Sequence, residues 1–116
     1  MTPNIKRGHI WWANLDPSRG TEADKIRPVV IIQTDLLNDV GHPSTIICPV
    51  TTNLSKKENI LRVIIPKNIG GIDKDSEILI DQIRTIDNTR LTSHIGILPT
   101  NNFMKLIESV KMVLDL

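Results

Sequence analysis

PVVIIQ, residues 28–33, is a continuous apolar run that begins at a proline and ends at a glutamine. A run of this length without polar alternation is typical of a β-strand that is covered on both faces. The segment TIICPVTT, residues 45–52, has the same character. Outward from these two, short β-branched stretches separated by Gly, Pro and Asp predict further strands at residues 10–15, 61–65, 77–80 and 82–86. The sequence therefore predicts a strand-rich domain.

The C-terminal segment has a different period. Its apolar residues recur at spacings of three and four: Phe103, Leu106, Ile107, Val110, Val113 and Leu114. This spacing predicts a helix with one buried face, with Thr100 as its N-cap, and a short helical turn is expected at residues 36–39. Strands followed by a terminal helix predict a single mainly β domain over residues 1–116, a curved antiparallel sheet or small barrel with a packed C-terminal α-helix.

Charge is distributed unevenly although the formal net charge is only +1. Residues 1–67 carry nine Lys and Arg against six Asp and Glu, whereas residues 68–116 carry five against seven. A strongly basic domain, the usual sign of a nucleic-acid-binding protein, is therefore absent. Any anion-binding face is expected in the first half of the chain.

Cysteine and histidine usage argues against a metal site or cofactor. Cys48 is the only cysteine, so no internal disulfide or multi-cysteine metal site is possible. The three histidines are widely separated in the sequence, so we expect neither a metal ion nor a cofactor. No stretch approaches the roughly 20 apolar residues of a membrane span, and the N-terminus has no apolar signal core, so we expect a cytoplasmic protein without membrane contact.

Several motifs together resemble those of the MazF/PemK toxin family. The chain opens with KRGHIWWANLDP (residues 6–17), RGTE (19–22) and RPVVII (27–32), and continues with PVTT (49–52) and DQIRTI (81–86). The order and the spacing match over residues 6–115, which is far more specific than one short motif. One departure is the segment EADKI (22–26), where many members have Glu-Gln followed by a Gly.

The resemblance implies a fold, an activity and partners. The fold would be an SH3-like barrel of the CcdB/MazF type with a C-terminal helix, assembled as a two-fold homodimer. The activity would be metal-independent cleavage of single-stranded RNA at a short sequence motif, inhibited by a cognate antitoxin protein. The segment EADKI (22–26) differs from that of many members and borders the substrate in relatives. The RNA sequence that relatives cleave therefore cannot be assigned to this chain.

Arg27 is the first candidate for catalysis. RNA is cut when its own 2′-hydroxyl attacks the adjacent phosphorus, so an enzyme needs to align the attack and stabilise the added charge. A guanidinium does this by binding the phosphate through two donors while keeping its charge. The alternative is a surface arginine paired with Glu22 or Asp24, and the family match favours catalysis.

Thr51 and Glu22 are the other catalytic candidates. Thr51 ends an apolar strand, where its hydroxyl could donate to a phosphate oxygen. Since neighbouring strand residues face opposite sides, only one of Thr51 and Thr52 is expected to enter the site. The alternative to a catalytic role is that these are two strand residues, one of whose hydroxyls hydrogen-bonds to the protein backbone. Glu22 would serve either as general base or as the group that orients Arg27, because a nearby arginine weakens a carboxylate as a base.

Further residues are candidates for binding rather than catalysis. A second group, expected to follow the RNA strand, comprises Arg19, Lys25, Thr52, Lys56, Lys57 and Arg62. Of the adjacent Trp11 and Trp12, one should face the core, leaving the other to face a partner or to stack on a base. Arg84 is expected to support the sheet or the dimer, and Cys48 to be a small buried hydrophobe.

Two rival functions use the same type of fold. One is a non-catalytic toxin that poisons a protein such as DNA gyrase, as CcdB does with a tryptophan near its C-terminus. This chain instead ends in VLDL and carries both tryptophans near its start. The other is an RNA-binding module that cuts nothing, against which the presence of Glu22, Arg27 and Thr51 argues. Fold alone does not separate these functions.

Overall fold

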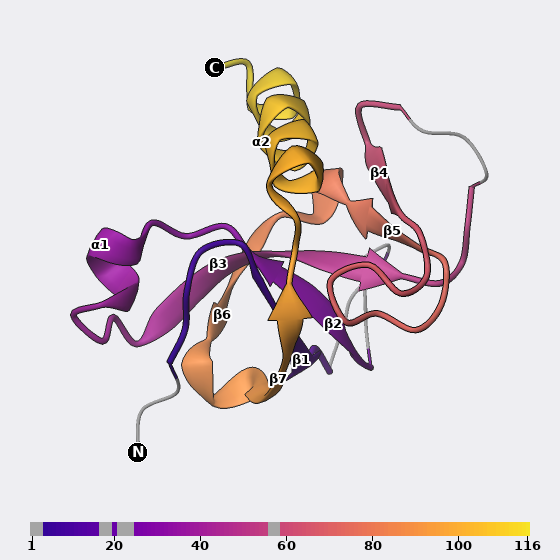
Figure 1. Ribbon diagram of the computed structural model, residues 1–116. Coiled ribbons are helices and arrows are strands. Elements are labelled where there is room, and N and C mark those ends of the chain that lie inside the picture. Colours follow the sequence, from indigo (N-terminus) through magenta and orange to yellow (C-terminus); the bar gives the residue numbers. More distant parts are fainter. Residues whose placement is uncertain (1–3, 17–19, 21–24, 56–58) are drawn as a thin grey trace.

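The computed structural model describes residues 4–16, 20, 25–55 and 59–116. It is rich in strands up to residue 97 and ends in one long helix (Figure 1). The strands are β1 (His9–Asn14), β2 (Ile26–Ile31), β3 (Ser44–Thr51), β4 (Arg62–Ile65), β5 (Ser76–Leu79), β6 (Arg84–Asp87) and β7 (Leu91–Ile97). The helices are α1 (Asp35–Asn38) and α2 (Thr100–Leu114), and the short 3-10 turns are η1 (Ile80–Gln82) and η2 (Asn88–Arg90). The prediction of a mainly β domain with a C-terminal helix is confirmed.

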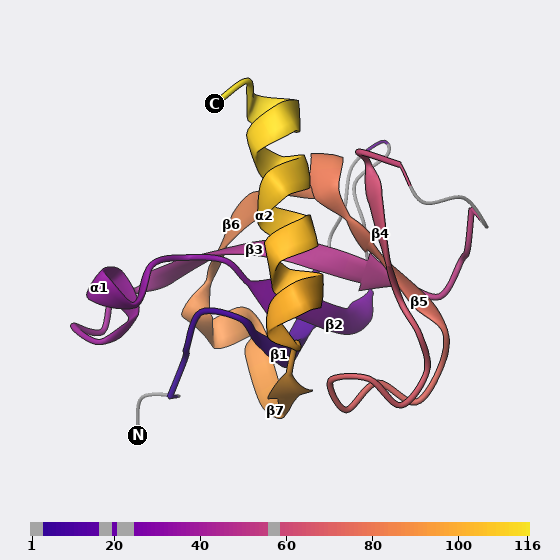
Figure 2. The same ribbon diagram turned by 45° about the horizontal axis from the view of Figure 1, so that its top comes forward.

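β3 is the strand around which the sheet is organised. The strand order is β4-β5-β3-β2-β1-β7, and β6 pairs with β3 as well. Residues 44–47 of β3 pair with β6, whereas Val50 and Thr51 pair with β5. Because β3 changes partner along its length, the antiparallel sheet is curved, and Figures 1 and 2 show its strands wrapping below and behind α2.

Apolar side chains fill both faces of this curved sheet. Leu106 and Val110 of α2 belong to one buried cluster, which the helix shares with β3, β4 and β5. A second cluster includes Val29 and Ile31 of β2, while Val30 between them belongs to the first. All three have 0% exposure, so β2 is covered on both faces, as its apolar run predicts.

β7 is the one strand for which the sequence pattern gave no prediction. Its sequence, LTSHIGI, has three consecutive polar residues, and its exposed residues outnumber its buried ones. β7 lies at the end of the sheet and pairs with β1 through a register interrupted twice. An exposed edge strand needs no apolar alternation, and Gly96 weakens the strand signal further.

Most expected boundaries differ from the structure by one or two residues; the strand expected at residues 28–33, for example, is β2 (Ile26–Ile31). Ile80 belongs to η1, so the strand predicted for residues 77–80 ends at Leu79, and the next begins at Arg84. The prediction of Thr100 as N-cap is wrong: Thr100 is the first helical residue and Pro99 occupies the N-cap position without a side-chain hydrogen bond. Proline is suited to a helix start because its ring fixes φ near the helical value.

The short helical turn expected at residues 36–39 is confirmed as α1, which is capped by the Thr34 hydroxyl accepting from the backbone N–H of Leu36 at 3.2 Å. Across the ranges that the structure describes, neither helix has the length and apolar composition of a bilayer-spanning segment.

Candidate functional site

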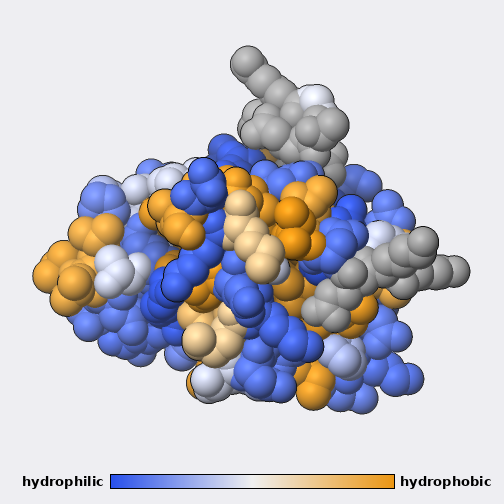
Figure 3. All heavy atoms as spheres, turned by 90° about the horizontal axis from the view of Figure 1, so that it is seen from above, coloured by the Kyte–Doolittle hydropathy of each residue, from blue (hydrophilic) through white to orange (hydrophobic). Residues whose placement is uncertain are grey.

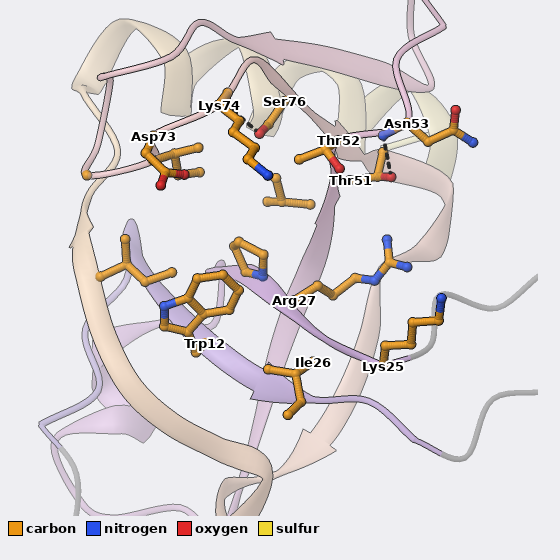
Figure 4. A pocket seen from close by; sticks show the side chains of 15 residues that line it. Trp12, Lys25, Ile26, Arg27, Thr51, Thr52, Asn53, Asp73, Lys74 and Ser76 are labelled. Atoms are coloured by element: carbon orange, nitrogen blue, oxygen red, sulfur yellow. Dashed lines mark hydrogen bonds between the residues drawn. The ribbon is translucent and has the colours of Figure 1, made fainter.

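A pocket of about 680 Å³ opens where β1, β2 and β3 meet the connection between β4 and β5 (Figure 4). One end of it is lined by cationic, hydroxyl and amide side chains: Lys25, Arg27, Thr51, Thr52 and Asn53. All five come from the first 67 residues, the half that the charge distribution predicts to bind anions. The other end is lined by an aromatic ring, an aliphatic side chain and two charged groups: Trp12, Ile95, Asp73 and Lys74.

Arg27 and Thr51 occupy corresponding positions on neighbouring strands. β2 and β3 are antiparallel, and their pairing runs from Ile31 with Ile47 to Val29 with Pro49. Two residues further along, β2 reaches Arg27 and β3 reaches Thr51, so both side chains belong to one face of the sheet. Beyond this point β2 continues beside β1 and β3 beside β5, and the pocket lies between the diverging strands. Figure 4 shows the Arg27 side chain reaching into the pocket on the same side as Thr51 and Asn53.

The chain that leads into Arg27 is held in place by backbone contacts. Lys25 has a φ of 66°, a conformation that a residue other than glycine adopts only when its surroundings stabilise it. Its N–H donates to the Asp16 carboxylate at 2.7 Å, and its carbonyl accepts from Leu15 N–H at 2.9 Å. Arg90 donates to the carbonyls of Asn14 and Asp16 at 3.0 and 2.6 Å. These bonds fix the start of β2, and with it the position from which Arg27 extends.

Thr51 ends β3 and lies in a well-packed position. It is 9% exposed and pairs with Glu77 of β5. Its hydroxyl oxygen accepts from the backbone N–H of Asn53 at 3.0 Å, which leaves the hydroxyl proton available to a ligand. The expectation that only one of the two threonines enters the site is wrong: both line the pocket. Strand alternation does not extend to Thr52, because β3 ends at Thr51 and the chain bends there.

A buried carboxylate next to Thr51 holds the following segment of chain. Glu77 is 1% exposed and accepts from the backbone N–H and the hydroxyl of Ser55 at 3.1 and 2.9 Å. The Arg62 guanidinium donates to the same carboxylate at 2.9 Å and lies 3.5 Å from the carbonyl oxygen of Asn53. Arg62 was expected to follow the RNA strand; it instead faces Glu77 and does not line the pocket. The sequence does contain a signal for this pair: Glu77 begins the otherwise apolar stretch EILI (residues 77–80), and a charged residue in a buried strand needs a partner.

Four of the expected site residues lie outside the described residues. These are Glu22, Arg19, Lys56 and Lys57. Their roles therefore stay predictions. The structure does bring together Lys25, Arg27, Thr51 and Thr52, four of the nine residues that the sequence predicted for catalysis or RNA binding.

The two tryptophans face opposite sides of β1, as adjacent strand residues should. Trp11 is 8% exposed and its ring packs edge-on against His94, with centroids 5.6 Å apart. Trp12 is 40% exposed and lines the pocket. The prediction that one of the pair faces the core is confirmed.

Cys48 and a pair of histidines do not line the pocket. Burial raises the pKa of the Cys48 thiol to about 12, so Cys48 is a buried apolar residue rather than a nucleophile. His9 and His94 place ring nitrogens 3.0 Å apart on β1 and β7, and desolvation together with the His94 charge lowers the pKa of His9. Within the described ranges, no three His, Cys, Asp or Glu side chains converge as metal ligands.

The fold and the chain both have relatives among known proteins. A crystal structure of MazF (Form-I) from Deinococcus radiodurans superposes with a TM-score of 0.83 over 98% of this chain and 99% of that one, at 23% identity. An endoribonuclease in complex with its cognate antitoxin, from a mycobacterial species, superposes with a TM-score of 0.76 over 97% and 96% of the two chains, at 14% identity. At these identities the likeness establishes the MazF-like fold.

Sequence comparison establishes the family. Endoribonuclease EndoA of Bacillus subtilis (strain 168) is 37% identical over 112 residues, which cover 97% of this chain and 96% of the relative. The family model for the PemK-like, MazF-like toxin of type II toxin-antitoxin systems matches residues 6–114. The resemblance inferred from the motifs is thereby confirmed, and the chain belongs to the PemK/MazF-like toxins of type II toxin-antitoxin systems.

Proposed function

We propose that this toxin is an endoribonuclease that cleaves single-stranded RNA in the pocket between β2 and β3. The observation that carries the proposal is the convergence of the Arg27 guanidinium and the Thr51 hydroxyl on one pocket from two neighbouring strands. The activity named for the Bacillus subtilis relative supports it. Neither a gyrase poison nor an RNA-binding module that cuts nothing would require this pairing of a guanidinium with a hydroxyl.

In the proposed reaction the RNA supplies its own nucleophile. The 2′-hydroxyl of the nucleotide before the cut gives up its proton to a base or to water, and its oxygen bonds to phosphorus as the bond from phosphorus to the 5′-oxygen breaks. The departing 5′-oxygen takes up a proton from water, which gives a 2′,3′-cyclic phosphate and a 5′-hydroxyl. Arg27 stabilises the negative charge on the non-bridging oxygens, and the Thr51 hydroxyl donates a hydrogen bond to one of them. Glu22 is proposed either to accept the 2′-hydroxyl proton or to orient Arg27.

Cleavage is expected to persist without divalent metal ions, because this reaction needs only aligned groups, proton transfer and a fixed positive charge. A long RNA incubated with the pure protein in EDTA should still be cut. The fragments should carry a cyclic or 3′-phosphate at one end and a 5′-hydroxyl at the other. Complete loss of cutting in EDTA, restored by a divalent ion, would contradict this mechanism.

We further propose that the toxin is a symmetric homodimer. A domain of this size buries a modest fraction of its surface alone, and large apolar side chains are exposed on it. Figure 3 shows apolar surface at the projecting end that carries α1, where Leu36 and Val40 are 82% and 77% exposed. Light scattering at micromolar concentration should give about twice the 13.0 kDa chain mass. A mass equal to one chain would refute the dimer.

A cognate antitoxin is proposed to inhibit the enzyme by covering the cationic end of the pocket. The mycobacterial endoribonuclease has a solved structure in complex with its cognate antitoxin. The expected antitoxin has a disordered, acidic C-terminal segment that folds onto the toxin and competes with RNA for Lys25 and Arg27. Equimolar antitoxin should stop cleavage; tight binding that leaves cleavage unchanged would exclude this mode of inhibition. The cytoplasmic location stays a prediction.

A further inference from the structure

The end of the pocket away from Arg27 has no role in the proposed phosphate chemistry. Trp12 of β1 and Ile95 of β7 line it from the sheet. Asp73 and Lys74, from the connection between β4 and β5, line it from the facing wall. Figure 4 shows the Trp12 indole on one side of the cavity and these two charged side chains on the other. The space between them adjoins the cationic end.

The exposed indole is the first indication of a ligand with a flat apolar face. The chain has two tryptophans, one phenylalanine and no tyrosine. Trp11 is buried, and Phe103 packs against the core beneath the Arg7 guanidinium. Trp12, at 40% exposure, is the aromatic ring that remains open to solvent, and it is open within the pocket. Base stacking on such a ring is a common source of single-stranded nucleic-acid affinity.

Asp73 is the second indication. Among the described residues that line the pocket it is the one acidic side chain, the other charged ones being cations, and a carboxylate repels the phosphates of a bound RNA. Both Asp73 and Lys74 are exposed, and neither side chain has a hydrogen bond or ion pair to another described residue. A carboxylate accepts hydrogen bonds only, so it matches the N–H donors on the edge of a base.

The wall that carries Asp73 and Lys74 is fixed against the sheet. A Cβ atom on Gly96 of β7 would lie 2.2 Å from the Gly70 carbonyl oxygen, and one on Gly71 would lie 2.7 Å from the Ile95 carbonyl oxygen. Backbone therefore packs directly on backbone at this place. The wall is braced further by the Ser76 hydroxyl, which donates to the Lys74 carbonyl at 2.9 Å. A wall held in this way presents its side chains in a preorganised position.

We propose that Trp12 and Asp73 form a subsite for a nucleobase adjacent to the scissile phosphate, and that this subsite selects an amino-bearing base over uracil. The inference rests on the proposed endoribonuclease function. The indole stacks on the base, and the Asp73 carboxylate accepts from an amino group of adenine, cytosine or guanine. Uracil fits poorly because keto oxygens flank its single N–H and face the carboxylate. Lys74 offsets the charge of Asp73 and lowers the repulsion of the RNA backbone.

The first test maps cut sites in a random-sequence RNA pool. The variants are Trp12→Ala, Trp12→Phe and Asp73→Asn, with Glu108→Gln on the exposed face of α2 as the matched carboxylate-to-amide control. The wild type and the control should disfavour uracil at one position next to the cut. Trp12→Ala should cut the preferred sequence about 5- to 100-fold more slowly, with a smaller loss in Trp12→Phe. Asp73→Asn should relax the selection against uracil at that position alone.

A second test measures the binding of an oligonucleotide that the protein cannot cleave. A short oligonucleotide that carries 2′-deoxyribose at the cut site should bind, quench tryptophan fluorescence in the wild type, and bind Trp12→Phe without that quenching. If the oligonucleotide binds and quenches but no RNA is ever cut, the subsite stands and the proposed enzymatic function fails. If the wild type, Trp12→Ala and Asp73→Asn all cut RNA at the same sequence motif, the proposed endoribonuclease function is supported and the nucleobase subsite is refuted.

Discussion

Replacing Arg27 with alanine is expected to lower single-turnover RNA cleavage by on the order of 10²–10³, the usual cost of removing one preorganised donor to a developing oxyanion. The guanidinium extends from the start of β2, whose backbone is held in place by hydrogen bonds that involve Lys25, Asp16 and Arg90. Arg27→Lys is expected to lose most of this rate as well, because it keeps the charge but not the planar pair of donors. Thr51→Ala should lose less, since a neutral hydroxyl stabilises the charge more weakly.

The measurement is the rate of cutting of a short RNA with enzyme in excess, with circular dichroism and light scattering to verify fold and assembly. Lys111→Ala removes an exposed cation from α2 that does not line the pocket, and it serves as the matched control. A folded Arg27→Ala protein that cuts at the wild-type rate would remove Arg27 from the mechanism and favour a non-catalytic toxin.

The sequence predicted those strands and helices in which the buried faces determine the spacing of the apolar residues. The apolar runs of β2 and β3 and the three-and-four spacing of α2 follow directly from which faces are covered. β7 escaped prediction because an edge strand exposed to solvent has no such pattern. The 3-10 turn η1 takes up the end of the strand predicted at residues 77–80 and the start of the one predicted at 82–86. It was missed because its Ile80 is as buried as a strand residue, so the apolar pattern does not change there.

The site was predictable as far as the family motifs reach. Arg27, Thr51 and Lys25 were named from the sequence and lie in one pocket. Asp73 and Lys74 were not, because two charged residues in a turn look like ordinary solvated surface until the fold sets them across from Trp12. The prediction for Thr52 was wrong because side chains alternate between the two faces of a sheet only within a strand, and β3 ends at Thr51.

The pair of Glu77 and Arg62 leads to the second large expected effect. Arg62→Met removes the guanidinium that faces a carboxylate of 1% exposure. Breaking a buried ion pair by removing one member costs about 3–5 kcal/mol. Because the Arg62 side chain is 28% exposed, solvent screens part of that interaction, and we expect a loss of about 2–3 kcal/mol in unfolding free energy. The melting temperature should fall by roughly 10 °C.

Adding Glu77→Gln to Arg62→Met should restore much of the lost stability. The amide has no charge to compensate, yet its oxygen can still accept from Ser55, which holds the segment after Thr51. Urea denaturation of the wild type, both single variants and the double variant gives the coupling free energy between the two positions. A large coupling would mean that the guanidinium is needed because the carboxylate is charged. If Arg62→Met were equally destabilising with glutamate or with glutamine at position 77, Arg62 would contribute by packing its aliphatic stem, and the charge of Glu77 would have no part in holding this side of the pocket.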